Sequence, residues 1–355
     1  MSEIKVNSIK GVSASTAAIS IDNSSGTCTA NITNNLSNRN LIINGAMMIS
    51  QRNGTSNTTI ASGATYGVDR FSARSQTGSG HTMAQTADAP AGFKYSAKIT
   101  IGTGGTPSSG NKNYFYQTVE GNNIAHLGAG TANAKTVTFS FFVKSSLTGN
   151  FGAAITNGGG DYSFTFPYTI NSANTWEKKT KTVPLTSSGT WPTNSDGGLT
   201  VFFDLGSGSD YEGTPNQWNN ALDIRSSSDV KLVATSSATL FITGVQLEVG
   251  VATDFEHRSV AQELLICQRY YAKGRSQLCF NGVSGRYSWR TIGRHNMRAS
   301  PTVTGSFASS GMGSIQGYSS QRQGDTGVDA TQIVVQTTPG SGADGVFTYT
   351  ADAEL

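Results

Sequence analysis

The chain has 355 residues, of which 42 are glycine, 8 are proline and only 13% are charged. This composition excludes a collagen repeat and a proline-rich disordered tract, and three cysteines do not make a disulfide framework. The net charge of +3 is too small to indicate nucleic-acid binding, and the sequence has neither a signal-peptide core nor an apolar run of membrane length. We therefore expect a protein that is made in a reducing cytoplasm and does not enter a membrane.

Residues 1–39 alternate like β-strands but carry little apolar mass. The alternation is clear in IKVNSIKG and in AAISIDNSSGTCTANITNN. An arm of this size cannot bury a core of its own, so we expect it to pair with another part of an assembly or with copies of itself. The alternative is a loose terminus.

Short strand-like runs fill residues 40–257. They include NLIING, VDRFSARS, YSAKITIG, YFYQTVEG, KTVTFSFFVKSS, FGAAITNG, YSFTFPYTI, EKKTKTVPL, LTVFFDLGSG and ATLFITGVQLEVG. Loops of Gly, Asn and Ser separate them, and helical periodicity is absent apart from a turn at GNNIAHLG. Many short strands in this length predict an all-β fold, a two-sheet sandwich of the jelly-roll type.

Residues 258–274 break this pattern with one amphipathic helix. Ser259 is a good N-cap, Gln262 completes a capping box with it, and Gly274 is a candidate C-cap. The apolar stripe consists of Val260, Leu264, Cys267 and Tyr271. A helix of about four turns is only marginally stable alone in water, so the stripe needs a partner surface.

Residues 275–355 return to β alternation, in runs such as QLCFNG, GRYSWRTIG, SPTVTGSF, TQIVVQTT and VFTYTADAEL. This is too much strand for a tail. We predict a second, smaller C-terminal β domain.

Several of these runs resemble, in order, a module of tailed-bacteriophage tail-fibre and related virion proteins. The matching blocks are NLIINGAMMISQRNGTS, YGVDRFSA, GAGTANAKTVTFSFFVKSSLTGNF, NTWEKKTKTVPL, LTVFFDLGSGSDYEG, FITGVQLEVGVATDFEHRSVAQELLICQRYYAK, MRASPTVT and YTADAEL. The resemblance runs from about Asn40 to Leu355 and does not cover the arm.

The resemblance implies a structural protein of the virion, on the tail or another surface appendage. It also implies a jelly-roll sandwich similar to carbohydrate-binding modules, and a homotrimer. We expect the arm to dock on other virion proteins and the body to recognise a glycan of the host surface. The alternative is a decoration or structural component of the capsid or tail that binds no receptor.

A trimer would give the helix stripe its partner. Around a three-fold axis, Val260, Leu264, Cys267 and Tyr271 would pack on their two symmetry mates, which predicts an oligomer interface. The alternative is packing on the sandwich of the same chain.

The acidic residues do not form the pattern of an enzyme. Glycosidases need two carboxylates on facing positions. The densest group, Asp204, Asp210 and Glu212, lies in a Gly/Ser-rich loop that also suits a turn or a Ca²⁺ contact. The four histidines have no metal-ligand spacing. We predict a protein without catalytic residues, metal or cofactor, and rank a polysaccharide-degrading enzyme below a binding or structural protein.

Loop aromatics and a basic cluster are the candidate glycan contacts. Trp191, Tyr211 and Trp218 lie in Asn-containing loops, where exposed rings can stack on sugars, although such rings also anchor loops. Arg286, Arg290 and Arg294 surround Trp289 and suit an anionic glycan, or equally ion pairs across a subunit interface. Eight basic residues and one acid, Glu263, lie between Arg258 and Arg298. Nothing resembles a nucleic-acid-binding module.

Overall fold

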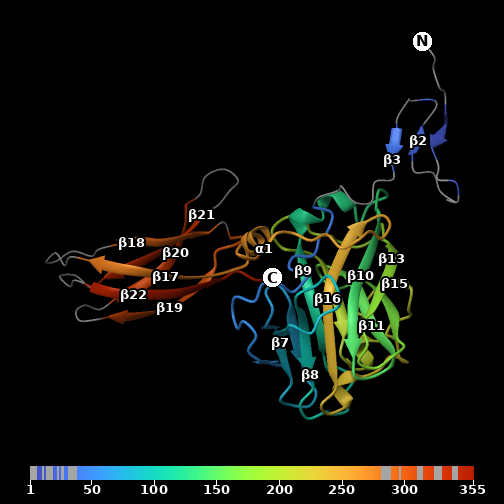
Figure 1. Ribbon diagram of the computed structural model, residues 1–355, viewed down its shortest axis with the longest axis horizontal. Coiled ribbons are helices and arrows are strands. Elements are labelled where there is room, and N and C mark those ends of the chain that lie inside the picture. Colours follow the sequence, from blue (N-terminus) through green and yellow to red (C-terminus); the bar gives the residue numbers. More distant parts are fainter. Residues whose placement is uncertain are drawn as a thin grey trace.

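The computed structural model describes residues 38–280, 289–295, 297–309, 315–323, 330–337 and 343–355, together with 6–9, 12, 19–21, 24 and 28–30 of the arm. It describes the backbone alone at 28–30, 278–280, 289–295, 307–309, 315–323, 330–337 and 343–345. Figure 1 shows a β-sandwich, a smaller β domain that extends from one side of it, and the strands of the arm set apart.

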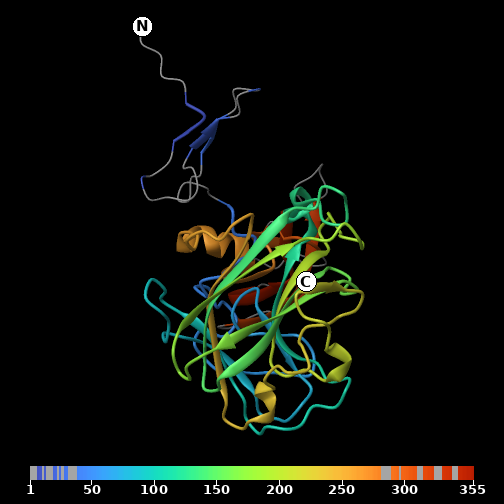
Figure 2. The ribbon, with the colours of Figure 1, turned by 90° about the vertical axis from the view of Figure 1, so that its right-hand side faces the viewer.

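Two antiparallel sheets form the sandwich. The six-stranded sheet has the order β13 (Glu177–Pro184), β10 (Thr136–Ser145), β16 (Thr239–Val249), β8 (Ser96–Thr100), β7 (Thr82–Thr86) and β4 (Thr58–Thr59). The seven-stranded sheet has the order β15 (Gln217–Asn219), β12 (Ser163–Ile170), β11 (Gly149–Asn157), β14 (Gly197–Asp204), β9 (Asn113–Glu120), β6 (Ser72–Ser75) and β5 (Thr65–Tyr66). Figure 2 shows the sheets from the side.

Short 3₁₀ turns connect the strands at η1 (Gly121–Asn123), η2 (Ala125–Leu127), η3 (Ser209–Tyr211) and η4 (Leu232–Ala234). The first two fall in the predicted turn at GNNIAHLG. No described helix is long and apolar enough to cross a membrane.

Alternation along the strands builds the core. In β10, Phe139 and Phe141 are fully buried and their ring centroids lie 5.5 and 4.8 Å from that of Phe203, which belongs to β14 of the facing sheet. Successive side chains of a strand point to opposite faces, so the residues between them point away from this core. The jelly-roll sandwich predicted from the sequence is confirmed.

The C-terminal domain consists of two three-stranded antiparallel sheets. One has the order β17 (Tyr271–Phe280), β22 (Ala343–Asp352) and β19 (Thr302–Ser309); the other has the order β18 (Trp289–His295), β21 (Ala330–Thr337) and β20 (Ile315–Gln323). The predicted smaller C-terminal β domain is therefore also confirmed. In the arm, β1 (Ser8–Ile9) and β3 (Cys28–Ala30) both pair with β2 (Ile19–Ile21), which lies between them.

Helix α1 (Val260–Cys267) is shorter than predicted. Its start is as expected, because the Ser259 hydroxyl accepts from the backbone of Gln262 in a full capping box. Its end is not, because Tyr271 and Gly274 belong to β17, where they pair with Asp352 and Tyr349 of β22. The hydrogen bonds of this ladder override the local helix signal, so Gly274 is not a helix cap.

The helix packs on its own chain. Cys267 and Tyr270 are buried with Ile43 and Ile49, and Leu264 packs against this cluster. Cys267 and Tyr271 are 1% and 7% exposed in the single chain, which corrects their assignment to a subunit interface, because a surface already covered cannot pack on a second copy. Val260 is 54% exposed and stays available.

A buried ionic network joins the two domains. Glu354 accepts from Arg52, with an N–O distance of 3.1 Å, and forms an ion pair with Arg70, whose side chain is 1% exposed. The two guanidinium groups also lie over aromatic rings, Arg52 at 3.7 Å from the centroid of Tyr271 and Arg70 at 3.6 Å from that of Tyr270. The end of β22 is thus held against the sandwich.

Candidate ligand-binding surfaces

The outer face of the seven-stranded sheet carries an aromatic cluster. Tyr114 and Tyr116 of β9 and Phe202 of β14 point away from the core, and Tyr211 of η3 packs beside them. The Tyr116 and Phe202 rings are stacked with centroids 5.5 Å apart, and Tyr114 meets Phe202 edge-on at 5.0 Å. We call these four residues the tyrosine platform. Tyr114 and Phe202 are buried, whereas Tyr116 and Tyr211 are partly exposed.

Polar groups flank the tyrosine platform. Arg74 of β6 lies opposite Tyr114 in the ladder, and its Nε is buried without a partner. Lys112 holds its Nζ 5.5 Å from the ring centroid of Tyr211. Burial raises the pKa of Tyr116 and of Tyr211, so both phenols stay protonated at neutral pH; the Tyr211 phenol donates to the Gly110 carbonyl, 3.4 Å away. The surface therefore combines exposed rings with donors and cations.

Arg225 positions the loop that carries Tyr211. Its fully buried guanidinium lies 3.3 Å from the Asp204 carboxylate, bonds Glu212 at 2.6 Å and donates to the carbonyls of Ser207 and Asp229. Burial raises the pKa of Asp204 to about 6 against the opposing effect of Arg225, so this carboxylate is charged at neutral pH. Asp204 and Glu212 thus brace a turn, which is one of the three readings considered for this acidic group.

The described part of the chain holds no group of three or more His, Cys, Asp or Glu side chains that could bind a metal ion.

Trp191 is not an exposed ring, which corrects its place among the candidate glycan contacts. It is 8% exposed and donates from Nε1 to the carbonyl of Ser188, 3.1 Å away. Its ring meets that of Trp218 edge-on at 5.8 Å, and Trp218 donates to the carbonyl of Pro184. The pair anchors loops to the sandwich, because Trp191 belongs to the buried core and Trp218 packs against it. Only Trp218 remains partly exposed.

The predicted basic cluster is only partly placed. Trp289, Arg290 and Arg294 lie on β18, whose side chains are outside the described residues, and Arg286 lies outside them altogether. Their proposed glycan contact stays a prediction.

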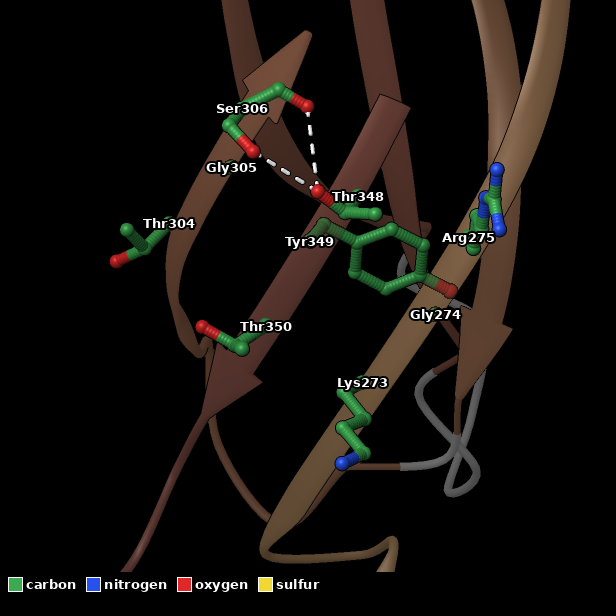
Figure 3. Close-up of a pocket in the computed structure, with 9 residues that line it drawn as sticks. All are labelled: Lys273, Gly274, Arg275, Thr304, Gly305, Ser306, Thr348, Tyr349 and Thr350. Carbon is green, nitrogen blue, oxygen red and sulfur yellow. Dashed lines mark hydrogen bonds between the residues drawn. The ribbon is translucent and has the colours of Figure 1, made fainter. Parts of the chain in front are cut away.

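A second candidate surface lies on the C-terminal domain. A cavity of about 590 Å³ opens on the sheet β17–β22–β19 and is shown in Figure 3. Its lining residues are Lys273, Gly274, Arg275, Thr304, Gly305, Ser306, Thr348, Tyr349 and Thr350. We call this cavity the C-terminal groove.

Sequence reasoning missed both surfaces in part. Tyr114 and Tyr116 stand two positions apart in a strand-like run, so their rings share one face of the sheet. The sequence analysis predicted a strand from this run and no aromatic surface. Lys273, which falls within the predicted helix of residues 258–274, lies on β17 instead.

Solved structures to which this chain is similar include a phage protein and sugar-binding proteins. A tailspike domain of bacteriophage CBA120, described as enzymatically active, is 12% identical over 60% of this chain and 22% of its own, with a TM-score of 0.32. A putative sugar binding protein from Bacteroides thetaiotaomicron is 16% identical over 59% of this chain and 100% of its own, with a TM-score of 0.35. A xylan-binding domain from Paenibacillus barcinonensis is 13% identical over 57% and 99%, with a TM-score of 0.26.

The chain therefore spans about a fifth of the tailspike domain's length. No family model matches the sequence, and no curated protein matches it.

Proposed function

We propose that this chain is a subunit of a bacteriophage tail fibre or similar virion appendage that recognises a host-surface glycan without cleaving it. The ordered sequence blocks from Asn40 to Leu355 support the virion assignment. The observation that carries glycan recognition is the tyrosine platform, where the partly exposed ring of Tyr116 lies on the seven-stranded sheet and that of Tyr211 packs beside it from η3.

The tyrosine platform has the chemistry that a sugar needs. The C–H faces of a sugar ring pack on an aromatic face, while its hydroxyls need donors and acceptors at the edge. Tyr116 and Tyr211 supply the rings and two protonated phenols, and Arg74 and Lys112 supply further donors. Strand positions are more rigid than loop positions, so Tyr116 is ordered before the ligand arrives.

A non-catalytic role accords with the use of the nearby carboxylates. Asp204 and Glu212, the acids that frame the Tyr211 loop, are both held by Arg225. A glycosidase needs one carboxylic acid free to give a proton and a second free to attack or to activate water. Asp204, whose ion pair with Arg225 is fully buried, and Glu212, which Arg225 also binds, are unsuited to either task, whereas Asp210 is exposed.

In the assembled appendage, we propose that three copies associate through exposed apolar side chains of α1 and that the arm docks on other virion proteins. Leu265 is 70% exposed and Val260 is 54% exposed. The arm joins the sandwich through Arg39, which bonds Thr253 at 2.7 Å and lies 3.6 Å from Glu248.

The test is adsorption of the purified protein to host cells and to an array of host-surface glycans. The variant Tyr116→Ala with Tyr211→Ala should weaken binding about tenfold or more, which corresponds to about 1.4 kcal/mol. Tyr95→Ala, which removes a partly exposed ring next to the opposite sheet, should leave binding unchanged. If both variants bind like the wild type, the tyrosine platform is not the glycan site.

A further inference from the structure

The C-terminal groove is a built trough across three strands. Lys273, Thr350 and Thr304 pair in register across the sheet and form one wall. Arg275, Thr348 and Ser306 form the other wall in the same way. Residues two apart on a strand are separated by about 7 Å, which sets the width between the walls. At about 590 Å³, the cavity falls within the size range of ligand pockets.

The floor of the C-terminal groove is main chain. Between the walls, Gly274, Tyr349 and Gly305 lie side by side in the ladder. The side chain of Tyr349 points to the opposite face of the sheet, and the two glycines have no side chain. On that face the Tyr349 ring lies across Gly274, since a Cβ there would come within 2.5 Å of the ring. Glycine at 274 therefore lets the ring lie flat, and the trough stays open above a strip of backbone.

The two sides of the C-terminal groove differ in charge. Lys273 and Arg275 both come from β17 and are exposed, and neither makes an ion pair with any described residue. Hydroxyl groups occupy the β22 and β19 side, where the Thr348 Oγ1 lies 2.8 Å from the Ser306 Oγ (Figure 3). The β17 end of the groove thus attracts an anion, and the β22 and β19 end offers neutral hydrogen-bond donors and acceptors.

These two cations account for part of the basic excess between 258 and 298. Three other members already have partners: Arg258 lies 3.5 Å from Glu263, Arg269 bonds Glu120 at 2.6 Å, and Arg298 donates to main-chain carbonyls, among them that of Ala353. Lys273 and Arg275 are therefore two basic residues of this region that remain open to solvent.

We propose that the C-terminal groove binds an acidic sugar unit, with its carboxylate on Lys273 and Arg275 and its hydroxyls on the Ser and Thr side chains. A guanidinium binds a carboxylate through two parallel hydrogen bonds, and the nearby ammonium adds a point charge. The inference rests on the proposed function and specifies its ligand: the appendage has a second subsite, selective for acidic glycan.

Single-stranded nucleic acid is also an anion, but the groove lacks what such a ligand needs. Proteins bind bases by stacking them on exposed aromatic rings, in addition to pairing phosphates with cations. Tyr349 is the single aromatic residue among the nine that line the groove, and its side chain is 6% exposed on the opposite face. Hydroxyl-lined walls suit sugar hydroxyls instead.

The experiment is calorimetric titration of the full chain with two probes, an alginate-derived hexauronate and neutral maltohexaose. Lys273→Gln with Arg275→Gln should weaken hexauronate binding at least tenfold and leave maltohexaose binding unchanged. Binding of hexauronate to the wild type should also weaken as salt rises. The control, Lys135→Gln with Lys178→Gln, removes the same charge from two exposed lysines of the sandwich. It should bind hexauronate like the wild type.

An equal loss of hexauronate binding in both double variants would contradict binding in the groove, because net charge alone would then explain the effect. Tighter binding of a dT12 oligonucleotide than of hexauronate, lost in the groove variant, would overturn the assignment to glycan. The proposed function fails separately: it is wrong if the wild type adsorbs to no host cell or glycan. If the wild type adsorbs and the groove variant binds hexauronate like the wild type, only the proposal of an acidic subsite is wrong.

Discussion

At the scale of single residues, Glu177 shows how one carboxylate closes a turn. Its Oε1 accepts from the backbone N–H groups of Asn171 and Ser172, at 2.8 and 2.9 Å, and its Oε2 accepts from Lys179 at 2.6 Å. These donors outweigh partial burial and lower the pKa of Glu177 from 4.5 to about 2. The turn between β12 and β13, which leads from the seven-stranded sheet to the six-stranded sheet, is therefore held by a charged side chain.

The variant Glu177→Gln should lower Tm by about 2–4 °C at pH 7, the shift expected for about 1 kcal/mol in a domain of this size. A carboxyl with a depressed pKa stabilises the fold above its unfolded pKa, and this contribution is lost as pH falls through the folded pKa. The difference in Tm between wild type and variant should thus be full above pH 5 and shrink toward pH 2. A difference that stays constant over this range would contradict the prediction.

Residue types alone did not distinguish a ligand contact from a buried anchor. Trp191 and Tyr211 both stand in polar loops, yet Trp191 is buried against Trp218 and Tyr211 is partly exposed. The difference depends on strands and loops brought together from distant parts of the chain, which no local pattern encodes. The alternation Tyr114–Tyr116 was readable, because a period of two is a local property.

At the scale of elements, the start of α1 was predictable and its end was not. A capping box is local chemistry between Ser259 and Gln262. The end is set by the pairing of β17 with β22, a strand that begins more than seventy residues later. The helix therefore ends before Tyr271, where the backbone begins to pair with β22.

Neighbouring leucines of α1 provide a test of the proposed trimer. Leu265→Asp should leave Tm nearly unchanged and reduce the mass from trimer to monomer in light scattering, because this side chain is 70% exposed in the single chain. Leu264→Asp is the matched contrast. It should lower Tm by itself, since Leu264 packs on the cluster around Cys267. A Leu265→Asp protein that keeps the trimer mass would remove this face of α1 from the interface.

At the scale of the whole molecule, the two domains are joined by charges that lie far apart in the sequence. Arg70 and Glu354 are separated by 284 positions, and both side chains are buried. The sequence supported a sandwich and a smaller β domain, since each rests on local alternation. It could not indicate which charged residues would meet between them.

Glu354→Gln should destabilise the protein by about 3–5 kcal/mol, because it leaves the buried Arg70 guanidinium without its carboxylate. Differential scanning calorimetry should show the C-terminal domain melting earlier than the sandwich. Asp352→Asn is the control: this side chain is 43% exposed and pairs with Arg52 near the surface, so its loss should cost less than about 1 kcal/mol. Equal effects of the two variants would mean that the junction is not held by a buried pair.

The same junction determines how the molecule carries a mechanical load. The C-terminal domain both begins and ends at the sandwich, because Tyr271 pairs with Asp352 and the Ala353 N–H donates to the Tyr270 carbonyl at 2.8 Å. A pull on a ligand at the proposed subsite in the C-terminal groove would therefore put β17 and β22 under tension side by side, in the same direction. Neither strand slides past the other, so their hydrogen bonds are not opened one after another. In β17 the force would pass along the backbone into α1, and in β22 it would pass to the Ala353–Tyr270 hydrogen bond and to the ion pairs of Glu354 with Arg52 and Arg70.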